Sequence, residues 1–385
     1  MQTDIFEYLY PRFKIDKPIR LIELFAGIGS QAKALKRIGV DFEHYKVVEF
    51  DKYAIKSYNA IHGTSFETID ITHTHANDLD ICNTDNYTFI LTYSFPCQDL
   101  SIAGKGKGMQ KGSGTRSGLL WEVERILNEC DELPQVLLME NVPQVHSKKN
   151  IEHFKKWIDF LETKGYRNHW QDLNAKDYGI PQNRKRCFMI SILGDYKYEF
   201  PQPFELKLRL KDVLEGEVDE KYYINDGKLN NIVSKNQLGY LSGGKWDKIN
   251  ESCRRYYDVN KTSPTIHTCQ GGNTEPKILV PEDTKKGYKE AYCGDGIYIN
   301  RPHQKRGTVQ RSMIQTLKTS CADVGVVTNN LRIRKLTPLE CWRLMGFDDS
   351  DFHKAELFNS NTQLYKQAGN SIVVNVLEAI FKMMF

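Results

Sequence analysis

The sequence predicts an α/β protein: a Rossmann-like domain built on a mostly parallel sheet, and a smaller, irregular, β-rich second domain. Between residues 19 and 195, short apolar runs alternate with amphipathic segments, which is the pattern of successive strand–helix units. Several of these runs end in a carboxylate or a cysteine, as expected where parallel strands open at a ligand-binding edge. Residues 200–330 carry few long apolar periods and many Gly, Asn, Lys and Tyr, which favours short strands joined by loops.

At 385 residues, the chain is long enough for one large domain and a smaller one. Its 53 basic and 49 acidic residues give a formal net charge of +4, so any basic surface must be local. Nine scattered cysteines without a C-x-x-C pair argue against disulfides or a structural zinc site and fit a reducing compartment. Met1–Ile5 shows no signal pattern, and no apolar run approaches the ~18 residues of a membrane span. We therefore expect a soluble, cytoplasmic protein with no metal and no membrane contact.

The first unit is an apolar strand from Ile19 to Phe25, followed by a glycine turn over 26–30 and an amphipathic helix from Gln31 to Ile38. Such a turn lets backbone approach a cofactor at a helix N-terminus. The turn falls short of the full G-x-G-x-x-G fingerprint and is equally typical of an ordinary tight turn, so it decides nothing alone.

Acidic residues end the next two predicted strands. Glu49 follows the strand 45–48, about 20 residues after the glycine turn, where a ribose hydroxyl is usually held. Asp70, within 69–71, stands at the end of a third expected strand. Carboxylates at such positions also occur as ordinary helix N-caps, but their recurrence at successive strand ends favours a shared ligand crevice.

Cys97 follows the fourth predicted strand, 89–91, and precedes a loop, 104–114, that holds five glycines and three lysines. The strand would fix the backbone of a nucleophile while the loop gives access; a lone cysteine here is otherwise a small buried hydrophobe. Such a loop should pack no core, and it is either a flexible surface segment or a cationic lid over a phosphate-bearing substrate. A helix begins near Leu119.

A fifth strand, 136–139, ends in Glu140, so a second ionisable side chain emerges at the same sheet edge as Cys97. A buried glutamate there can act as a proton donor with a raised pKa. A helix is expected over 151–164. Beyond it, alternation along a further strand sends three side chains to one face: Gln182, Arg184 and Arg186. Arginines entering a core are costly unless they meet an anion, which makes them candidate site residues.

In this order and spacing, the motifs resemble the DNA (cytosine-5)-methyltransferase family, and its bacterial and phage members in particular. The resemblance covers residues 19–376, and no catalytic motif of the family is missing. A mild departure is Ser94-Phe95, where Pro-Phe or Gly-Phe is commoner before the Pro-Cys pair. The matching segments are Phe25-Ala26-Gly27-Ile28-Gly29, Glu49, Asp70, Phe95-Pro96-Cys97-Gln98, Glu140-Asn141-Val142, Gln182-Asn183-Arg184-Lys185-Arg186, 334–347 and Gln367-Ala368-Gly369-Asn370-Ser371.

The resemblance implies methyl transfer from S-adenosylmethionine to carbon-5 of a cytosine in double-stranded DNA. In the family's scheme the Cys97 thiolate adds to ring carbon-6, and Glu140 holds the exocyclic amine and protonates or hydrogen-bonds ring nitrogen 3. Arg184 and Arg186 would brace the base. Because the thiolate is the reactive form, nearby arginine and the lysines of the loop are expected to depress the Cys97 pKa. The base must be flipped out of the duplex to be reached.

The resemblance also implies binding residues. Glu49 would bind the cofactor's ribose, Asp70 its adenine amine, and Phe25 would stack on the adenine. The implied cofactor contacts are Phe25, Gly27, Ile28, Glu49, Phe50, Asp70, Ile71, Pro96, Leu119, Asn370 and Ile372. The implied contacts to DNA or the flipped nucleotide are Gln98, Ser101 and Arg116.

The family's organisation implies a discontinuous catalytic domain, made of residues 1–195 and a returning segment, 350–385. The motif 366–375 would open the last helix, beside the glycine turn. Residues 196–349 would form a target-recognition domain, which reads bases through Arg, Asn and Gln and holds phosphates through Lys. A single Arg or Lys there is more often a solvated surface charge. The family suggests a monomer, and any cognate restriction endonuclease is encoded separately.

Other classes fit less well. A nicotinamide oxidoreductase would share the glycine turn and Glu49 but would not require Cys97, Glu140 and Arg184 together. A zinc nucleobase deaminase requires H-x-E and P-C-x-x-C, and the chain has neither. Two alternatives stay open: a catalytically silent DNA-binding homologue, and an RNA cytosine methyltransferase, which the sizeable 200–330 segment disfavours.

Overall fold

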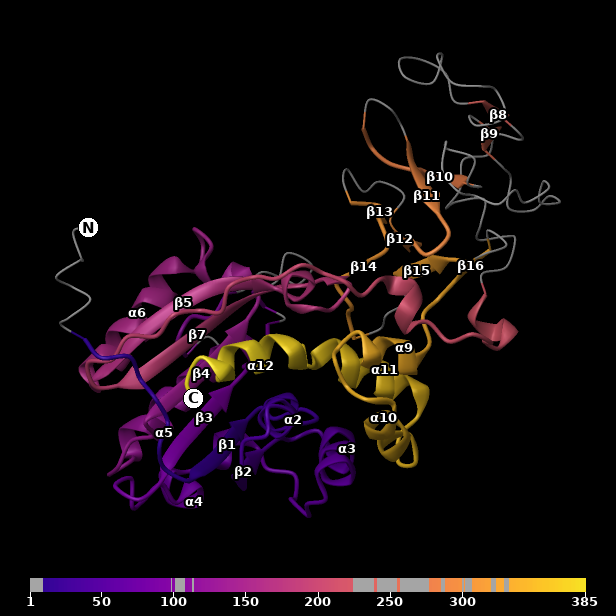
Figure 1. The fold of residues 1–385 in the computed structure, drawn as a ribbon. Coiled ribbons are helices and arrows are strands. Elements are labelled where there is room, and N and C mark those ends of the chain that lie inside the picture. The colour runs from indigo at the N-terminus through magenta and orange to yellow at the C-terminus, as the bar shows by residue number, and fades with distance from the viewer. Residues whose placement is uncertain are drawn as a thin grey trace.

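The structure of the protein, a computed structural model, has an α/β lobe and a smaller β-rich lobe that projects from one end of it, at the upper right of Figure 1. None of the helices described is long and apolar enough to cross a membrane. The residues described are 10–97, 99–100, 108–112, 114–223, 239–240, 255–256, 277–284, 288–299, 301, 307–319, 323–328 and 332–385.

A six-stranded sheet forms the centre of the α/β lobe. The pairs β2–β1, β1–β3 and β3–β4 are parallel, and β7 runs antiparallel to both β4 and β5, so the predicted mostly parallel sheet is confirmed. β3 and β4 are buried along their whole lengths, as expected for central strands covered on both faces. In spatial order the strands are β2 (Phe42–Val48), β1 (Ile19–Leu24), β3 (Thr88–Tyr93), β4 (Val136–Asn141), β7 (Lys185–Leu193) and β5 (Tyr166–Asn174).

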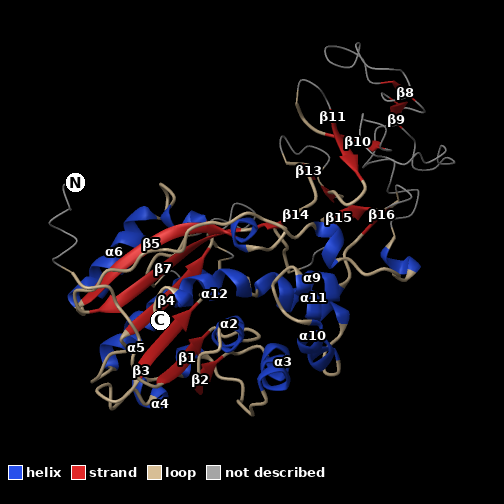
Figure 2. Cartoon of the chain, viewed as in Figure 1, coloured by secondary structure: helices blue, strands red, loops and turns tan. Residues whose placement is uncertain are grey.

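Helices cover both faces of this sheet (Figure 2). Neighbouring strand residues enter different cores because side chains alternate: Leu138 packs with α2 and α12, and Leu137 packs with α5 and α6. The helices are α2 (Ser30–Arg37), α3 (Lys52–His62), α4 (Ala76–Leu79), α5 (Leu120–Glu129), α6 (Ile151–Thr163), α9 (Pro338–Arg343), α10 (Asp349–Glu356), α11 (Asn361–Asn370) and α12 (Val374–Lys382). Short 3-10 turns are η1 (Ile71–His73), η2 (Arg116–Leu119), η3 (Pro143–His146), η4 (Ala175–Tyr178), η5 (Leu210–Val213) and η6 (Glu220–Tyr222).

The strand expected to end at Asp70 is absent. Residues 64–70 are irregular, and β3 pairs directly with β1 instead. Asp70 caps η1, since its Oδ1 accepts a hydrogen bond from the Thr72 amide at 2.9 Å. The prediction was wrong because the apolar run is too short to fill a buried strand position. The Ile69 amide still donates to the Glu49 carbonyl at 2.9 Å, which brings this segment to the end of β2.

The described part of the β-rich lobe consists of short strands, as predicted, and a parallel strand pair joins it to the α/β lobe. That pair is β14 (Ile314–Gln315) beside β6 (Gln182–Asn183). Gln182 strengthens the junction: its Nε2 donates to the Leu344 carbonyl at 2.8 Å and its Oε1 accepts from the Leu317 amide at 3.2 Å. The other strands are β8 (Gly239–Tyr240), β9 (Arg255–Tyr256), β10 (Lys277–Pro281), β11 (Tyr288–Tyr292), β12 (Gly296–Tyr298), β13 (Val309–Gln310), β15 (Val324–Val327) and β16 (Ile333–Arg334).

The motif 366–375, in the part of the chain that returns to the α/β lobe, belongs to two helices rather than one. The segment 366–375, expected to open the last helix, ends α11 and begins α12, with an extended break at 371–373. Ile372 and Val373 are buried in the core at this break, and the Val374 amide donates to the Met345 carbonyl at 3.0 Å. α12 then lies along the sheet beside α2, the helix that follows the glycine turn (Figure 1).

Glu23 of β1 is a fully buried carboxyl group. Its Oε2 accepts a hydrogen bond from the Tyr58 hydroxyl at 2.5 Å, and that hydroxyl lies 2.9 Å from His44 Nδ1. Burial raises the pKa of Glu23 to about 7, against the opposing effect of the Tyr58 hydrogen bond. The folded protein therefore holds this proton more tightly than the unfolded chain does.

We expect Glu23 to lower the free energy of unfolding as the pH rises from about 4.5 to about 7, by on the order of 3 kcal/mol. Glu23→Gln lacks this titration, so its stability relative to the natural protein should improve between pH 5 and pH 8. Burial lowers the pKa of His62 to about 3, which gives the opposite trend. The difference between the two proteins at each pH, measured by urea unfolding, isolates Glu23; a difference independent of pH would contradict the prediction.

Candidate active site

Four strand ends meet at one edge of the sheet, and each carries a segment that the sequence singled out. The glycine turn 25–29 follows β1, Glu49 follows β2, Cys97 lies beyond β3, and Glu140 is near the end of β4. β7 is antiparallel and therefore begins at this edge, which adds Arg186 to the group. Such an edge is the usual ligand-binding position of open α/β sheets.

Cys97 is half-buried, in an irregular segment held against the end of β4. The Asn141 side chain donates from Nδ2 to the Phe95 carbonyl at 2.9 Å, and its Oδ1 accepts from the Val142 amide at 2.8 Å. Asn141 is only 2% exposed, so this contact fixes the backbone two residues before the thiol. The sequence therefore placed Cys97 correctly at a strand-to-loop boundary.

Glu140 and Arg186 form an ion pair at this edge. Arg186 Nε lies 3.2 Å from Glu140 Oε1, and the two side chains are 15% and 10% exposed. Burial raises the pKa of Glu140 above its ordinary value, although the positive charges of Arg186 and Arg184 oppose the shift. The raised pKa favours the protonated carboxyl group, which is the form that can donate a proton, as the sequence suggested.

The pKa of Cys97 is raised, not depressed. Burial of the thiol has the largest effect, the negative charge of Glu140 adds to it, and the arginines only partly offset both. The expectation of a depressed pKa was wrong because it counted the cations and left out the burial and the carboxylate. Protonation of Glu140 would remove one cause of the raised pKa, so the two groups titrate as a coupled pair.

Arg184 has a different environment from Arg186. Its guanidinium donates to the carbonyls of Leu317 and Gly369 at 3.0 Å each and of Ser371 at 2.9 Å, and the residue is 4% exposed. These contacts join the strand β6 region, the β-rich lobe and the end of α11. Gly369 permits the close approach, because a Cβ there would lie 2.5 Å from the Thr319 amide nitrogen. The positive charge of Arg184 acts to lower the pKa values of both Cys97 and Glu140.

Glu49 connects the ends of β1 and β2. Its Oε2 accepts from the Gly27 amide at 2.9 Å and its Oε1 from the Asp51 amide at 2.8 Å. A carboxylate has about four acceptor positions, so these two bonds leave capacity for a ligand hydroxyl. Next to it, Phe50 is 72% exposed. Phe25 has a φ of +56°, a costly conformation for a bulky residue of the kind that clusters at functional sites.

The C-terminal segment packs against the end of β2. Lys366 Nζ lies 2.7 Å from Asp51 Oδ2, and the Gln367 side chain donates to the Tyr53 carbonyl at 3.0 Å. Asn370, at the end of the same helix, is exposed. The structure therefore brings the motif around Asn370 to the same region as Glu49, although they are more than 300 residues apart in sequence.

The remaining sequence-predicted residues fall into three groups. The side chains of three are nearly fully buried and belong to the two core clusters: Ile28, Ile71 and Ile372. Pro96 and Leu119 are half-buried near the nucleophile segment, and Arg116 is exposed at the start of η2. Gln98 and Ser101 lie outside the described residues.

The described part of the loop 104–114 packs more tightly than its composition suggested. Met109 is fully buried, and Trp121 Nε1 of α5 donates to its carbonyl at 2.7 Å. Lys111 Nζ forms an ion pair with Glu124 at 2.7 Å. The expectation that the segment packs no core is wrong at Met109, because one long apolar side chain suffices to anchor a glycine-rich loop.

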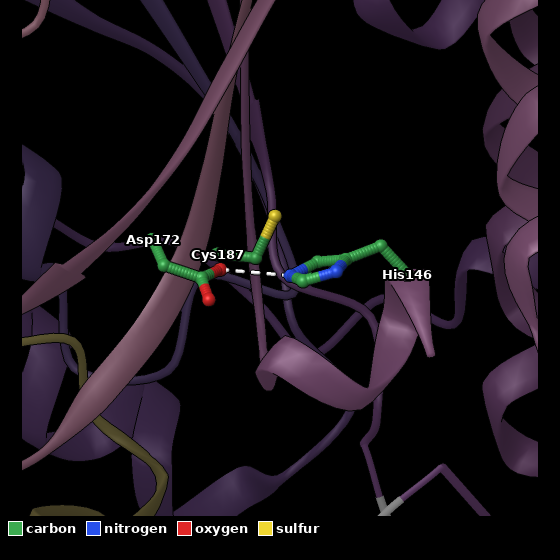
Figure 3. A group of neighbouring side chains, drawn as sticks. All are labelled: His146, Asp172 and Cys187. Carbon is green, nitrogen blue, oxygen red and sulfur yellow. Dashed lines mark hydrogen bonds and ion pairs between the residues drawn. The ribbon is translucent and has the colours of Figure 1, made fainter. Parts of the chain in front are cut away.

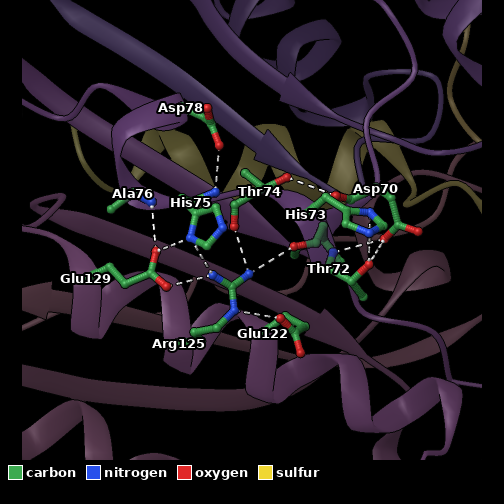
Figure 4. A network of polar contacts seen from close by, with 11 residues as sticks. Asp70, Thr72, His73, Thr74, His75, Ala76, Asp78, Glu122, Arg125 and Glu129 are labelled. Atoms are coloured by element: carbon green, nitrogen blue, oxygen red, sulfur yellow. Dashed lines mark hydrogen bonds and ion pairs between the residues drawn. The ribbon is translucent and has the colours of Figure 1, made fainter.

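Arg125 of α5 holds the turn that carries Asp70 (Figure 4). Its Nη2 donates to the Ile71 carbonyl at 3.2 Å and to the Thr74 carbonyl at 2.7 Å. Glu122 and Glu129 fix the guanidinium through ion pairs of 2.8 Å each. Sequence reasoning missed Arg125, because an arginine between two glutamates on a helix reads as an ordinary solvated ion pair.

A second group of ionisable side chains lies where η3, β5 and β7 meet: His146, Asp172 and Cys187 (Figure 3). Their ligand atoms lie within 4.8 Å of one another. Asp172 contacts His146 Nε2 at 2.9 Å through Oδ1 and Lys185 Nζ at 3.1 Å through Oδ2. We interpret the group as a hydrogen-bonded contact that fastens the turn after β4 to β5, and the absence of a metal stays a prediction.

The fold and the crowded strand ends define a class, the Rossmann-like α/β enzymes of the S-adenosylmethionine-dependent methyltransferase type. The family described as C-5 cytosine-specific DNA methylase matches residues 19–385. The type II methyltransferase M2.ScrFI of Lactococcus lactis subsp. cremoris is 33% identical, over 95% of this chain and 99% of its own length. The orphan methyltransferase M.SPBetaI of Bacillus phage SPbeta is 32% identical, over 94% and 97%.

Solved structures agree in fold. An Entamoeba histolytica methyltransferase, EhMeth, superposes with a TM-score of 0.61 at 18% identity, covering 96% of this chain and 98% of that one. The chain therefore belongs to the C-5 cytosine-specific DNA methylase family, and it is an enzyme of that family. The resemblance expected from the motifs is confirmed.

Proposed function

We propose that this protein methylates carbon-5 of cytosine within a defined double-stranded DNA sequence, with Cys97 as nucleophile. One observation carries the proposal: the charges of Glu140, near the end of β4, and Arg186, at the start of β7, form an ion pair and both act on the half-buried Cys97 thiol beyond β3. A nucleophile and a proton donor beside it are what addition to a cytosine ring requires.

S-adenosylmethionine fits the other half of the same edge. Glu49 has acceptor capacity left for the ribose, Asp70 stands in a turn with its carboxylate largely exposed, and the exposed Phe50 offers an apolar face to a purine. Phe25, held in its strained conformation, would stack on the adenine. When bound, the cofactor supplies an electrophilic methyl group on sulfur.

The chain's own residues then perform the following steps. The Cys97 thiolate forms a bond to carbon-6 of the cytosine while Glu140 donates a proton or hydrogen bond to ring nitrogen 3, so carbon-5 gains electron density and accepts the methyl group. Loss of the carbon-5 proton to a base, departure of the Cys97 sulfur from carbon-6 as thiolate, and return of any proton on ring nitrogen 3 to Glu140 restore the aromatic ring. Arg186 keeps Glu140 in place, 3.2 Å away.

DNA must present the cytosine outside its stack, at a cost of roughly a few kcal/mol. The β-rich lobe, attached through β6 and β14 beside the active-site edge, would read the surrounding bases. The sequence-predicted contacts Gln98, Ser101 and Arg116 would hold the flipped nucleotide or its strand. Like the relatives named above, the protein would act as a DNA-modifying enzyme, either alone or beside a restriction endonuclease.

The test is bisulfite sequencing of plasmid DNA from cells that express the protein. We expect cytosines to be protected in one recurring sequence and nowhere else. Absence of protection, with S-adenosylmethionine binding intact, would overturn the proposal and favour a silent DNA-binding homologue. Tritiated methyl transfer to RNA but not to DNA in the purified reaction would instead identify an RNA substrate.

One prediction concerns the turn that carries Asp70. Arg125→Ala removes two donors from the carbonyls of Ile71 and Thr74, so we expect S-adenosylmethionine affinity to fall about tenfold. Isothermal titration calorimetry measures the change. Arg12→Ala, which breaks an exposed ion pair with Glu199, is the control and should leave the affinity unaltered. Equal affinity in both variants would exclude a positioning role for Arg125.

A further inference from the structure

Ser117 makes an unusual contact with the nucleophile segment. It is fully buried in η2, and its Oγ donates to the Pro96 carbonyl at 2.7 Å while accepting from the Asp99 amide at 3.3 Å. These two partners lie on either side of Cys97 in the chain. One hydroxyl group therefore connects the backbone before the thiol to the backbone after it.

The contact is reciprocal. Asp99 Oδ2 accepts from the Arg116 amide at 2.9 Å and from the Ser117 amide at 3.4 Å. The Leu100 amide donates to the Cys97 carbonyl at 3.1 Å, which closes a turn that begins at the nucleophile. The turn is thus tied to η2 through main-chain and side-chain atoms in both directions.

Helix capping does not account for Ser117. A capping serine accepts a hydrogen bond from an amide of its own helix. Thr115 has that role in η2, because its Oγ1 accepts from the Gly118 amide at 3.2 Å. The Ser117 hydroxyl is directed instead to a segment about 20 residues earlier in the chain. A function in placing Cys97 explains why a buried hydroxyl is directed there.

We infer that Ser117 is a positioning residue that sets the place of the Cys97 sulfur relative to the cytosine ring. This inference rests on the proposed function of Cys97. Asn141 holds the Phe95 carbonyl, and Ser117 holds the next carbonyl along, that of Pro96. Removing the hydroxyl leaves the Pro96 carbonyl and the Asp99 amide without this buried partner, so the segment should relax and the sulfur should move. A misplacement of about 1 Å can cost about 100-fold in rate.

The experiment compares Ser117→Ala, Ser117→Cys and a matched control, Ser191→Ala, which alters a fully buried serine in the middle of β7. Two rates are measured at saturating DNA and S-adenosylmethionine. The first is single-turnover methyl transfer. The second is covalent trapping on DNA that carries 5-fluorocytosine. Fluorine replaces the carbon-5 proton in this base and cannot be removed by a base, so Cys97 stays bonded to carbon-6.

We expect Ser117→Ala to slow both rates about 10- to 100-fold, with dissociation constants for DNA and cofactor changed less than about twofold. Ser117→Cys, with a weaker donor of similar size, should fall between it and the natural protein. The pH profile of iodoacetamide alkylation of Cys97 should shift to lower pH in Ser117→Ala, because burial and Glu140 both raise the pKa of that thiol. Ser191→Ala should change none of these.

Natural rates together with an unshifted alkylation profile in Ser117→Ala would overturn the inference. If Ser117→Ala does not fold, natural rates in Ser117→Cys at a lowered melting temperature would overturn it equally, because they would assign the hydroxyl to stability alone. If the natural protein transfers no methyl group, the proposed function fails, and the alkylation profile still decides whether Ser117 positions the thiol.

Discussion

Cys97→Ala is expected to reduce methyl transfer below detection while DNA binding persists. The variant removes the sulfur that must bond to ring carbon-6, and no other group of the described site can replace a thiolate as a nucleophile toward an unactivated pyrimidine. The alanine leaves the Phe95 and Pro96 carbonyl contacts in place, so the surrounding backbone should keep its shape.

The measurement is methyl incorporation into DNA from labelled cofactor, paired with a filter-binding titration on the same DNA. Cys82→Ala is the matched control, because Cys82 is another free cysteine on the surface loop before β3. We expect natural activity in the control and none in Cys97→Ala. Full activity in Cys97→Ala would contradict the covalent mechanism. Loss of DNA binding would show that the substitution disturbs the structure as well as the methyl-transfer step.

Glu140→Gln should produce two effects of opposite sign. Methyl transfer should fall roughly 100- to 10,000-fold, the usual contribution of a positioned acid. Glutamine keeps the size of the side chain and an oxygen that Arg186 can contact, but it cannot give up a proton at ring nitrogen 3. The same substitution removes a negative charge that raises the Cys97 pKa, so the thiol should become easier to ionise.

The second effect separates proton donation from a general disturbance of the site. At pH 8, iodoacetamide should alkylate Cys97 faster in Glu140→Gln than in the natural protein, although turnover is slower. Glu152→Gln, at an exposed position in the first turn of α6, should alter neither rate. If both alkylation and methyl transfer slow in Glu140→Gln, the residue shapes the site rather than donating a proton.

Sequence reasoning was most reliable where the chain repeats a simple physical pattern. The strands that lead to Glu49, Cys97 and Glu140 could be placed because apolar runs and the residues after them are visible in the sequence. The predicted alternation likewise agrees with the structure, because Gln182 and Arg184 are buried and Arg186 is half-buried, whereas Asn183 and Lys185 between them are exposed. Each of these depends on neighbours along the chain.

The failures depend on neighbours in space. A third strand was expected to end at 69–71, but a run becomes a strand only if it finds a pairing partner, and β3 takes the place beside β1. The direction of the pKa shift of Cys97 depends on burial of the thiol, which the spacing of arginines in the sequence does not reveal. Arg125 and Ser117 act through carbonyl groups of distant segments, so their side-chain identity alone carries no signal of their partners.

The junction at Arg184 has a consequence for how recognition specificity can change. Arg184 donates hydrogen bonds to the main-chain oxygens of Leu317, Gly369 and Ser371, and every residue type has such an oxygen. The hydrogen bonds therefore place no requirement on the side chain at position 317, where burial in the core favours an apolar residue, whereas position 369 must remain glycine to avoid a clash with the Thr319 amide. Under the proposed function, a β-rich lobe with different base preferences could replace the present one, provided that its β14 backbone still pairs with β6. The main-chain contacts of Arg184 would not restrict the side chains to which the proposal assigns base recognition.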